Sequence, residues 1–242
     1  MPGLDAFTSL QRETAIRQTR MGGVYAAPQA VLAPPREDWL QPGLKRAMDV
    51  LGAGAMLVIL SPMLLLLALI VRADGGPAFF AHRRIGRDGD AFGCLKFRSM
   101  VTDSQARLDT LLASDPAARA EWDATRKLKN DPRVTRIGRF LRATSLDELP
   151  QLLNVLRGEM SLVGPRPVIQ SELDRFYGAA AIHYMSVRPG ITGLWQVSGR
   201  SDTSYAQRVA LDMAYVARPS VWQDIRILLR TPMAVLSRRG AR

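Results

Sequence analysis

The sequence predicts a mostly helical α/β protein with a small β-hairpin that is attached to a membrane. An uncharged apolar run, VLGAGAMLVILSPMLLLLALIV, covers residues 50–71. Two strand-like segments in AFFAHRRIGRDGDAFGCLKFRSM flank the turn-forming dipeptide Asp88-Gly89. Helix-like patterns of apolar and charged residues recur from residue 103 onward.

The composition limits the kinds of partner and the kinds of site that the protein can have. The 242 residues include 33 Lys and Arg against 22 Asp and Glu, a net charge of +11. This excess indicates an anionic partner: nucleic acid, a phosphate-bearing substrate or an acidic membrane surface. The single cysteine excludes an internal disulfide, and two histidines without ligand spacing argue against a zinc site.

Three regions follow from the patterning. Residues 1–42 contain scattered prolines and no apolar stretch of the signal-peptide type, so we expect a flexible N-terminal arm. Residues 43–74 hold the membrane segment, and residues 75–242 form a catalytic or binding domain beside the membrane.

The membrane segment has two interpretations. About 22 helical residues at roughly 1.5 Å each would just cross the hydrocarbon core. Pro62 falls at the midpoint, where it removes a backbone hydrogen bond, and Ser61 could satisfy the freed carbonyl. Basic residues flank both ends, so the positive-inside rule identifies no outside. A segment broken at Ser61-Pro62 that returns to its own side and a kinked span fit the residues equally well.

The predicted hairpin carries two cations. Lys96 and Arg98 alternate with Leu95 and Phe97, and a period of two places both cations on one face. A solvated face is the commoner role of such a pair. Farther on, residues 103–129 read as one or two short amphipathic helices that break near Pro116, without a catalytic constellation.

A series of arginines precedes the motif SLDELPQ. A helix over residues 136–142 would gather several guanidinium groups on one face, which is either solvated or binds phosphates. Ser145 to Glu148 fits a helix-capping box, although this structural role does not account for Pro150. The arginines recur at every third position: Arg133, Arg136, Arg139 and Arg142.

The acidic pair within that motif could also do chemistry. If a helix N-terminus and nearby arginines keep Asp147 ionised, its carboxylate is a competent nucleophile toward phosphorus. Glu148 could hold magnesium or act as a base, since magnesium prefers carboxylate and phosphate oxygens. The arginine series and the segment Pro165-Arg166-Pro167 could neutralise the anionic substrate.

Taken together, these motifs resemble the bacterial sugar transferases, or monotopic polyprenyl-phosphate phosphoglycosyl transferases. The resemblance covers about residues 45–236. It implies a re-entrant membrane helix, interfacial amphipathic helices, and a domain on the cytosolic face of the bacterial inner membrane. The matching segments are KRAMDV, the Ser61-Pro62 break, LKFRSM, NDPRVTRIGRFLRATSLDELPQLLNVLRGEMSLVGPRP, VRPGITGLWQVSGR and ALDMAYV.

The same resemblance implies an activity. It is the transfer of hexose-1-phosphate from a UDP-hexose to undecaprenyl phosphate, with release of UMP, as the first membrane step of exopolysaccharide biosynthesis. Asp147 would form a covalent phosphosugar, and Asp147 and Glu148 would hold Mg²⁺. The long segment between LKFRSM and NDPRVT resembles the branch that uses UDP-glucose or UDP-galactose.

Substrate-binding residues follow from the matching motifs and from the arginine series. Asp212 resembles an additional acidic position of the family, although an ion pair with Arg208 explains it equally well. The amphipathic segment VWQDIRILLRTPMAVL, with Trp222 and Arg226, could lie in the membrane interface. The expected substrate-binding residues are Lys96, Arg98, Arg139, Arg142, Pro165, Arg166, Arg200 and Asp212.

The expected partners are therefore a UDP-hexose, undecaprenyl phosphate and the inner leaflet of the membrane, without nucleic acid and with a homodimer left open. A rival interpretation of the same charge pattern is a non-catalytic, basic, membrane-tethered module that gathers nucleic acid or anionic lipid.

Overall fold

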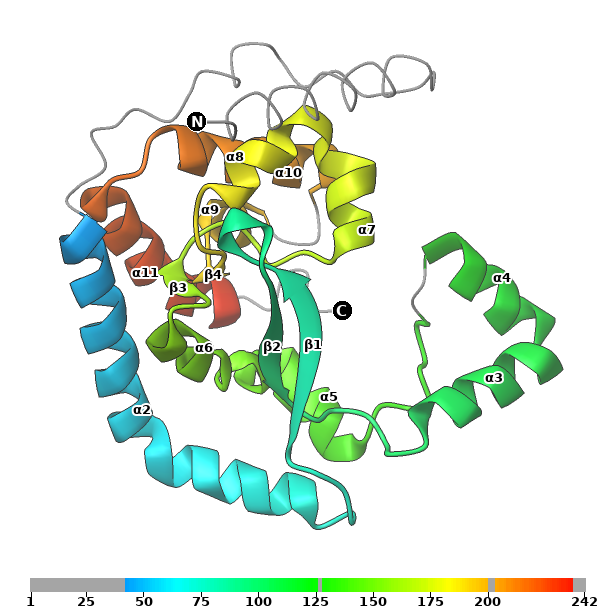
Figure 1. Cartoon of the computed structure of the whole chain (residues 1–242). Coiled ribbons are helices and arrows are strands. Elements are labelled where there is room, and N and C mark those ends of the chain that lie inside the picture. Colours follow the sequence, from blue (N-terminus) through cyan, green and yellow to red (C-terminus); the bar gives the residue numbers. More distant parts are fainter. Residues whose placement is uncertain (1–41, 126–127, 200–202, 237–242) are drawn as a thin grey trace, which may run out of the picture. The chain divides into compact units, whose positions relative to one another are not determined.

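The computed structural model describes residues 42–125, 128–199 and 203–236. Predictions for the N-terminal arm before Pro42 and for Arg200 lie outside these residues. The described part is mostly helical, as expected, with two small sheets (Figure 1). In chain order, the elements are α2 (Pro42–Arg72), β1 (Phe79–Ile85), η2 (Arg87–Gly89), β2 (Ala91–Phe97), α3 (Ser104–Ser114), α4 (Pro116–Thr125), α5 (Arg136–Thr144), η3 (Leu146–Glu148), α6 (Gln151–Arg157), β3 (Ser161–Val163), α7 (Gln170–Glu172), η4 (Leu173–Tyr177), η5 (Gly178–Ala180), α8 (Ala181–Met185), β4 (Gly190–Thr192), α9 (Leu194–Ser198), α10 (Tyr205–Ala217) and α11 (Val221–Leu236).

Helix α2 contains the predicted membrane segment, and it is bent rather than broken. Pro62 lies inside the helix, and Figure 1 shows the ribbon of α2 changing direction along its length. The Ser61 hydroxyl donates to the Val58 carbonyl at 2.8 Å, the acceptor that the ring of Pro62 deprives of its usual partner. The helix therefore continues through Ser61-Pro62 as a bend, because the serine hydroxyl replaces the hydrogen bond that the proline removes.

Most of α2 is not packed inside the protein. Within the described residues it is the one helix long and apolar enough to cross a membrane, and only 11% of its most apolar window is buried. A core helix of a soluble protein would hide this surface. The exposure therefore fits contact with lipid along most of the helix.

The N-terminal end of α2 is anchored by buried charges. The ammonium of Lys45 lies 2.7 Å from a carboxylate oxygen of Asp224 in α11 and 3.1 Å from Asp49 one turn farther along α2. Asp49 in turn accepts hydrogen bonds at 3.0 Å from the Ser161 hydroxyl and the Leu162 amide of β3. These contacts join α2 to α11 and to the parallel sheet.

The C-terminal end of α2 is anchored to the same part of the protein. Arg98 donates to the Val71 carbonyl at 2.8 Å and to the Pro77 carbonyl at 2.7 Å, and it forms an ion pair with Asp74. Both ends of α2 are thus tied to the elements that follow it. Beside Arg98, an apolar cluster packs α2 against β2 and α5 through Leu67, Val71, Phe97 and Leu141.

The predicted hairpin is confirmed. β1 and β2 pair in antiparallel register from Phe79 opposite Phe97 to Ile85 opposite Ala91. The turn between them contains Asp88 and Gly89, which have φ angles of 58° and 82°. Glycine and aspartate tolerate this left-handed conformation better than most residues, so the local sequence fixes the turn.

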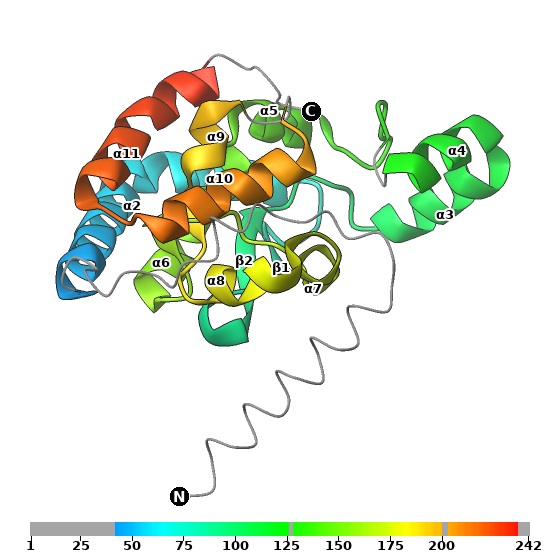
Figure 2. The same ribbon diagram turned by 90° about the horizontal axis from the view of Figure 1, so that it is seen from above.

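The remaining elements agree with the sequence patterns in most places. α3 and α4 are two helices separated at Asp115-Pro116, and Figures 1 and 2 both show them side by side. α5 and α11 also form as expected. The second sheet was not predicted: its strands β3 and β4 have three residues each and pair in parallel, Ser161 opposite Gly190 and Val163 opposite Thr192.

Candidate active site

The acidic pair lies in a 3-10 turn between two helices. Ser145, which the capping box had placed at a helix start, instead ends α5 with a φ of 57° and makes no side-chain cap. The Glu148 amide donates to the Ser145 carbonyl rather than to its hydroxyl. Helix α6 begins only at Gln151, directly after Pro150, where the missing N–H of proline costs no helical bond. The prediction of a capping box is therefore wrong, and the place of Pro150 is explained.

Asp147 is buried in this turn, with 8% of its surface exposed. Burial, and then the neighbouring Glu148 carboxylate, raise the pKa of Asp147 to about 6, although Lys96 and Arg142 oppose the rise. This environment differs from the expected helix N-terminus, which would have lowered the pKa. At pH 7 the carboxylate is still mainly ionised, and it is more basic than an ordinary aspartate.

Glu148 forms a close ion pair with Lys96. The ammonium lies 2.7 Å from Oε1 of Glu148, and the glutamate side chain keeps 40% of its surface exposed. Burial opposes the charge on Glu148, but Lys96, Arg166 and Arg84 hold its pKa below the usual range. For Lys96, burial is likewise outweighed by Glu148 and Asp147, which raise its pKa. Lys96 thus forms an ion pair with Glu148 and interacts electrostatically with Asp147.

Asn154 fixes the strand that carries Lys96. Its side-chain oxygen accepts from the Leu95 amide at 3.0 Å, and its nitrogen donates to the Gly93 carbonyl at 2.8 Å and to Glu159 at 2.6 Å. The fully buried amide therefore acts as a neighbouring strand on the free edge of β2. Since α6 starts three residues after Glu148, this contact holds β2 and the acidic pair in register.

Two further arginines, which the sequence did not assign to the site, join its cations: Arg84 is close enough to Glu148 to lower its pKa, and Arg208 lies near Arg166. Arg84 is on β1 and pairs with Glu172 at 3.3 Å, and burial together with Arg166 lowers its pKa. It shares a face of the hairpin with Lys96, because the two residues are separated by an even number of steps in the register. Arg208 is on α10, and burial and Arg166 lower its pKa as well. Repulsion within this group favours a bound anion.

Arg166 and Arg208 meet at one aromatic ring. Their guanidinium carbons lie 5.4 Å and 5.1 Å from the centre of the Trp195 ring. Such contacts orient a guanidinium while leaving its N–H groups for other acceptors. Pro165, which precedes Arg166, is buried. The structure thus brings the predicted Pro-Arg-Pro segment to helix α9, which carries Trp195.

Arg98 does not join this group. Within the described residues, its side-chain hydrogen bonds go to Val71, Asp74 and Pro77, at and just after the end of α2, and to Met100. Side chains alternate between the two faces only within a strand, and β2 ends at Phe97, one residue before Arg98. The alternation therefore did not predict the direction of the Arg98 side chain. The assignment of Arg98 to substrate is replaced by a structural role.

The two arginines of α5 that were expected to bind substrate, Arg139 and Arg142, have different surroundings. Arg142 donates to the Ser99 hydroxyl at 2.9 Å and is close enough to Asp147 to lower its pKa. Arg139, one turn before Arg142 in the helix, is exposed next to the exposed ring of Phe140. The structure therefore brings Arg142 to the site and leaves Arg139 on the surface.

Asp212 lies buried in α10 and does not pair with Arg208. The Tyr177 hydroxyl donates to Oδ2 of Asp212 at 2.9 Å, while Oδ1 has no hydrogen-bond partner among the described residues. Burial raises the pKa of Asp212 to about 7, against the effects of Tyr177 and Arg166. Asp212 therefore supports the segment of Arg166 from behind.

The donor set at the acidic pair fits a magnesium ion held partly by substrate. In the part of the chain that the structure describes, no group of three or more His, Cys, Asp or Glu side chains could hold a metal alone. Asp147 and Glu148 offer two adjacent carboxylates. Magnesium bound by one or two carboxylates and completed by phosphate oxygens and water needs no more.

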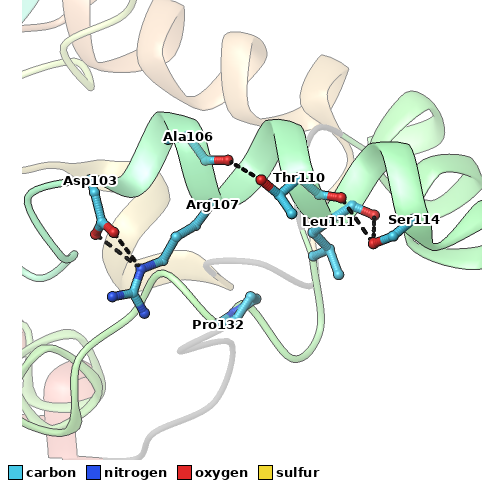
Figure 3. A pocket seen from close by; sticks show the side chains of 7 residues that line it. All are labelled: Asp103, Ala106, Arg107, Thr110, Leu111, Ser114 and Pro132. Carbon is cyan, nitrogen blue, oxygen red and sulfur yellow. Dashed lines mark hydrogen bonds and ion pairs between the residues drawn. The ribbon is translucent and has the colours of Figure 1, made fainter.

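A pocket of about 420 Å³ lies elsewhere, between α3 and Pro132 (Figure 3). Its polar side chains are satisfied locally: Arg107 donates to Asp103 at 2.9 Å, and the Thr110 hydroxyl donates to the Ala106 carbonyl at 2.9 Å. None of the predicted site residues lines it. The pocket is therefore not the candidate site.

Comparisons with known proteins agree with the chemistry that the geometry of this site suggests. A family model described as bacterial sugar transferase matches residues 40–238. Over 198 residues the chain is 57% identical to a UDP-galactose-lipid carrier transferase of Erwinia amylovora, a match that covers 82% of this chain and 41% of the relative. It is 53% identical over 198 residues to the exopolysaccharide production protein ExoY of Rhizobium meliloti, covering 81% and 87%. With the UDP-glucose:undecaprenyl-phosphate glucose-1-phosphate transferase of Caulobacter vibrioides it shares 42% over 206 residues, covering 81% and 71%. The chain thus spans about two fifths of the Erwinia protein and most of ExoY.

Proposed function

The chain belongs to the bacterial sugar transferase family, and we propose that it transfers hexose-1-phosphate from a UDP-hexose, glucose or galactose, to undecaprenyl phosphate. The observation that carries this proposal is the buried Asp147 beside the Lys96–Glu148 ion pair, within reach of the charges of Arg84, Arg142 and Arg166. A carboxylate of raised basicity among cations suits attack on an anionic phosphorus. The names of the relatives, which include galactose and glucose transferases, support the same reaction class.

The proposed reaction has two steps. A carboxylate oxygen of Asp147 attacks the β-phosphorus of the UDP-hexose, and the bond from this phosphorus to the bridging oxygen breaks, so that UMP leaves with the electron pair. A phosphate oxygen of undecaprenyl phosphate then attacks the same phosphorus and releases the Asp147 carboxylate. The products are UMP and undecaprenyl-diphosphate-hexose.

Each cation has a role in this proposal. Lys96 and Arg142 oppose the negative charge where the donor approaches Asp147, and Arg84, Arg166 and Arg208 bind the phosphates farther from the acidic pair. Asp147 and Glu148 are the residues that would hold Mg²⁺, which when bound would neutralise charge on the phosphate oxygens. Arg166 and Trp195 would orient the nucleotide end of the donor.

Membrane attachment through a re-entrant α2 is part of the proposal. Its support is that both ends of α2 are tied to the elements that follow: Lys45 to Asp224, and Val71 to Arg98. A straight span would separate its ends by the full bilayer thickness, about 30 Å of hydrocarbon. We therefore expect α2 to enter one leaflet and return, with the catalytic residues on the cytosolic side of the inner membrane.

The test of this function is UMP release. The purified chain in bilayers is mixed with undecaprenyl phosphate, Mg²⁺ and one UDP-sugar at a time. We expect repeated turnover, with many equivalents of UMP per protein, only when all three are present, and faster with UDP-glucose or UDP-galactose than with UDP-N-acetyl sugars. Without the lipid phosphate, UMP release should stop at about one equivalent per protein. Continued UMP release that does not depend on the lipid phosphate, or no release with any hexose, would overturn the proposal. A basic binding module would instead show salt-sensitive binding that is indifferent to Asp147.

The pH dependence of this reaction should report on Asp147. Because the carboxylate must be ionised to attack, we expect kcat/KM to fall as the pH drops through about 6, the pKa to which burial raises Asp147. Lys96→Met removes a cation that lowers this pKa, so the acid limb of the profile should move to higher pH. The exposed Lys129→Met is the matched control and should leave the limb in place. An acid limb unmoved in Lys96→Met would contradict the assigned electrostatics.

A further inference from the structure

Three large aromatic side chains are exposed near the C-terminal end of α2. Phe79, Phe80 and Phe140 have 47%, 54% and 51% of their surface exposed, and we call them the aromatic edge. Phe79 and Phe80 are adjacent in β1, so their side chains leave opposite faces of the strand. Both rings nevertheless keep about half of their surface exposed, although Phe97, opposite Phe79 in the sheet, is buried.

The aromatic edge is continuous with the lipid-facing part of α2. Phe79 stacks on Phe97, with ring centres 5.2 Å apart, and Phe97 packs directly in the cluster with Leu67 and Val71 of α2. Phe140 is next to Leu141, a fourth member of that cluster. The apolar surface of α2 therefore continues across the base of the hairpin and onto α5.

Basic side chains surround this apolar surface. Arg136 and Arg139 are exposed in the turn of α5 that precedes Phe140, and Arg72 and Arg83 are exposed on the segments next to Phe79 and Phe80. Asp74, the acidic residue between Arg72 and Phe79, is paired with Arg98. The arginines beside the exposed aromatic rings therefore match the boundary between acyl chains and anionic headgroups. A protein partner for this surface would need an apolar centre with a rim of negative charge around it. A membrane leaflet has both by its own structure.

We propose that the aromatic edge, Phe79, Phe80 and Phe140, is a second membrane contact, inserted at headgroup depth in the leaflet that holds α2. The proposal rests on the membrane attachment of α2 proposed above. It gives Arg139 a lipid phosphate as its partner in place of the donor. It also has a consequence for the reaction, because Phe80 lies directly opposite Lys96 in the sheet. The headgroup layer, where the acceptor phosphate lies, then reaches the strand that carries the cation bound to Glu148.

The test uses single cysteines in the full-length chain in bilayers. The native Cys94 is 1% exposed, and burial raises its pKa to about 11, so it stays unlabelled at neutral pH. Phe80→Cys and Phe140→Cys are labelled with an environment-sensitive fluorophore and quenched by nitroxides placed near the top of the acyl chain. Val58→Cys, on the exposed part of α2, serves as the embedded reference. Asp90→Cys is the matched control at the other end of the same hairpin, about 20 Å from its base.

The expected result is quenching at positions 80 and 140 that is more than half as strong as at position 58, with little at position 90. The proposal is overturned if positions 80 and 140 resemble position 90. In that case strong quenching at position 58 shows that membrane attachment of α2 survives without the second contact. Labels at 80 and 140 that are shielded from water but not quenched by lipid would also overturn it, since a protein surface, such as a second copy of the chain, would then cover the edge.

Discussion

Asp147→Asn is expected to abolish turnover, with a loss of about a thousandfold or more in kcat. The amide cannot form the proposed bond to phosphorus, and the neighbouring carboxylate of Glu148 is held in an ion pair with Lys96. The measurement is UMP release in bilayers at saturating donor and acceptor. Membrane association and folding should be intact, because burial disfavours the charged form of Asp147 and a neutral side chain of the same shape relieves that cost.

The loss in Asp147→Asn does not by itself separate a covalent route from direct attack by the lipid phosphate, in which Asp147 would only bind metal. A UDP-hexose labelled in its β-phosphate, offered without acceptor, separates the two. The covalent route leaves label on the protein at Asp147 and releases one equivalent of UMP. Glu148→Gln is the matched variant, since it changes the neighbouring carboxylate and keeps the nucleophile. Protein without label after exposure to donor and Mg²⁺ would argue for direct attack.

Local signals allowed much of the fold to be predicted. Asp88-Gly89 determines the hairpin turn by its backbone preference, and α5 begins at Thr135, whose hydroxyl accepts from the Gly138 amide. The motif from Ser145 to Glu148 was ambiguous in a physical sense. The same four residues satisfy a capping box or the end of one helix followed by a 3-10 turn, and the structure takes the second because α5 runs into Ser145.

The missed parts of the site depend on contacts between distant segments. Arg84 and Arg208 join the cations only because the hairpin, the Arg166 segment and α10 converge, and nothing within a few residues of either arginine signals this. Arg98 shows the converse error. Its spacing from Lys96 suggested a shared role, but Asp74 and the carbonyls at the end of α2 bind its guanidinium. The strands β3 and β4 are too short for periodicity to detect.

Lys45→Met is expected to lower the free energy of unfolding by about 3–5 kcal/mol, the cost of leaving buried carboxylates without their cation. The side chains of Asp49 and Asp224 are only 2% and 3% exposed, and the Lys45 ammonium contacts both. Urea unfolding in detergent micelles, followed by tryptophan fluorescence, measures the loss, with the exposed Lys129→Met as the same substitution in a neutral setting.

The loss of unfolding free energy in Lys45→Met should change with pH, and the pKa of Asp224 sets the direction of that change. Burial already raises the pKa of Asp224 while Lys45 opposes the rise, so removing Lys45 raises it further. A carboxyl whose folded pKa is raised binds its proton more readily when folded, and the destabilisation of Lys45→Met should therefore shrink as the pH falls from 8 toward 5. Adding Asp224→Asn should recover part of the loss at pH 8, since the amide oxygen can still accept from the Tyr215 hydroxyl, now 2.8 Å from Asp224. A loss below about 1 kcal/mol, the size typical of an exposed ion pair, and equal at both pH values would mean that this cation does not anchor α2.

Because Lys45 also donates to the carbonyl of Val163, two residues before Pro165, the variant should weaken donor binding as well as stability, which links the anchoring of the membrane helix to the segment of Arg166.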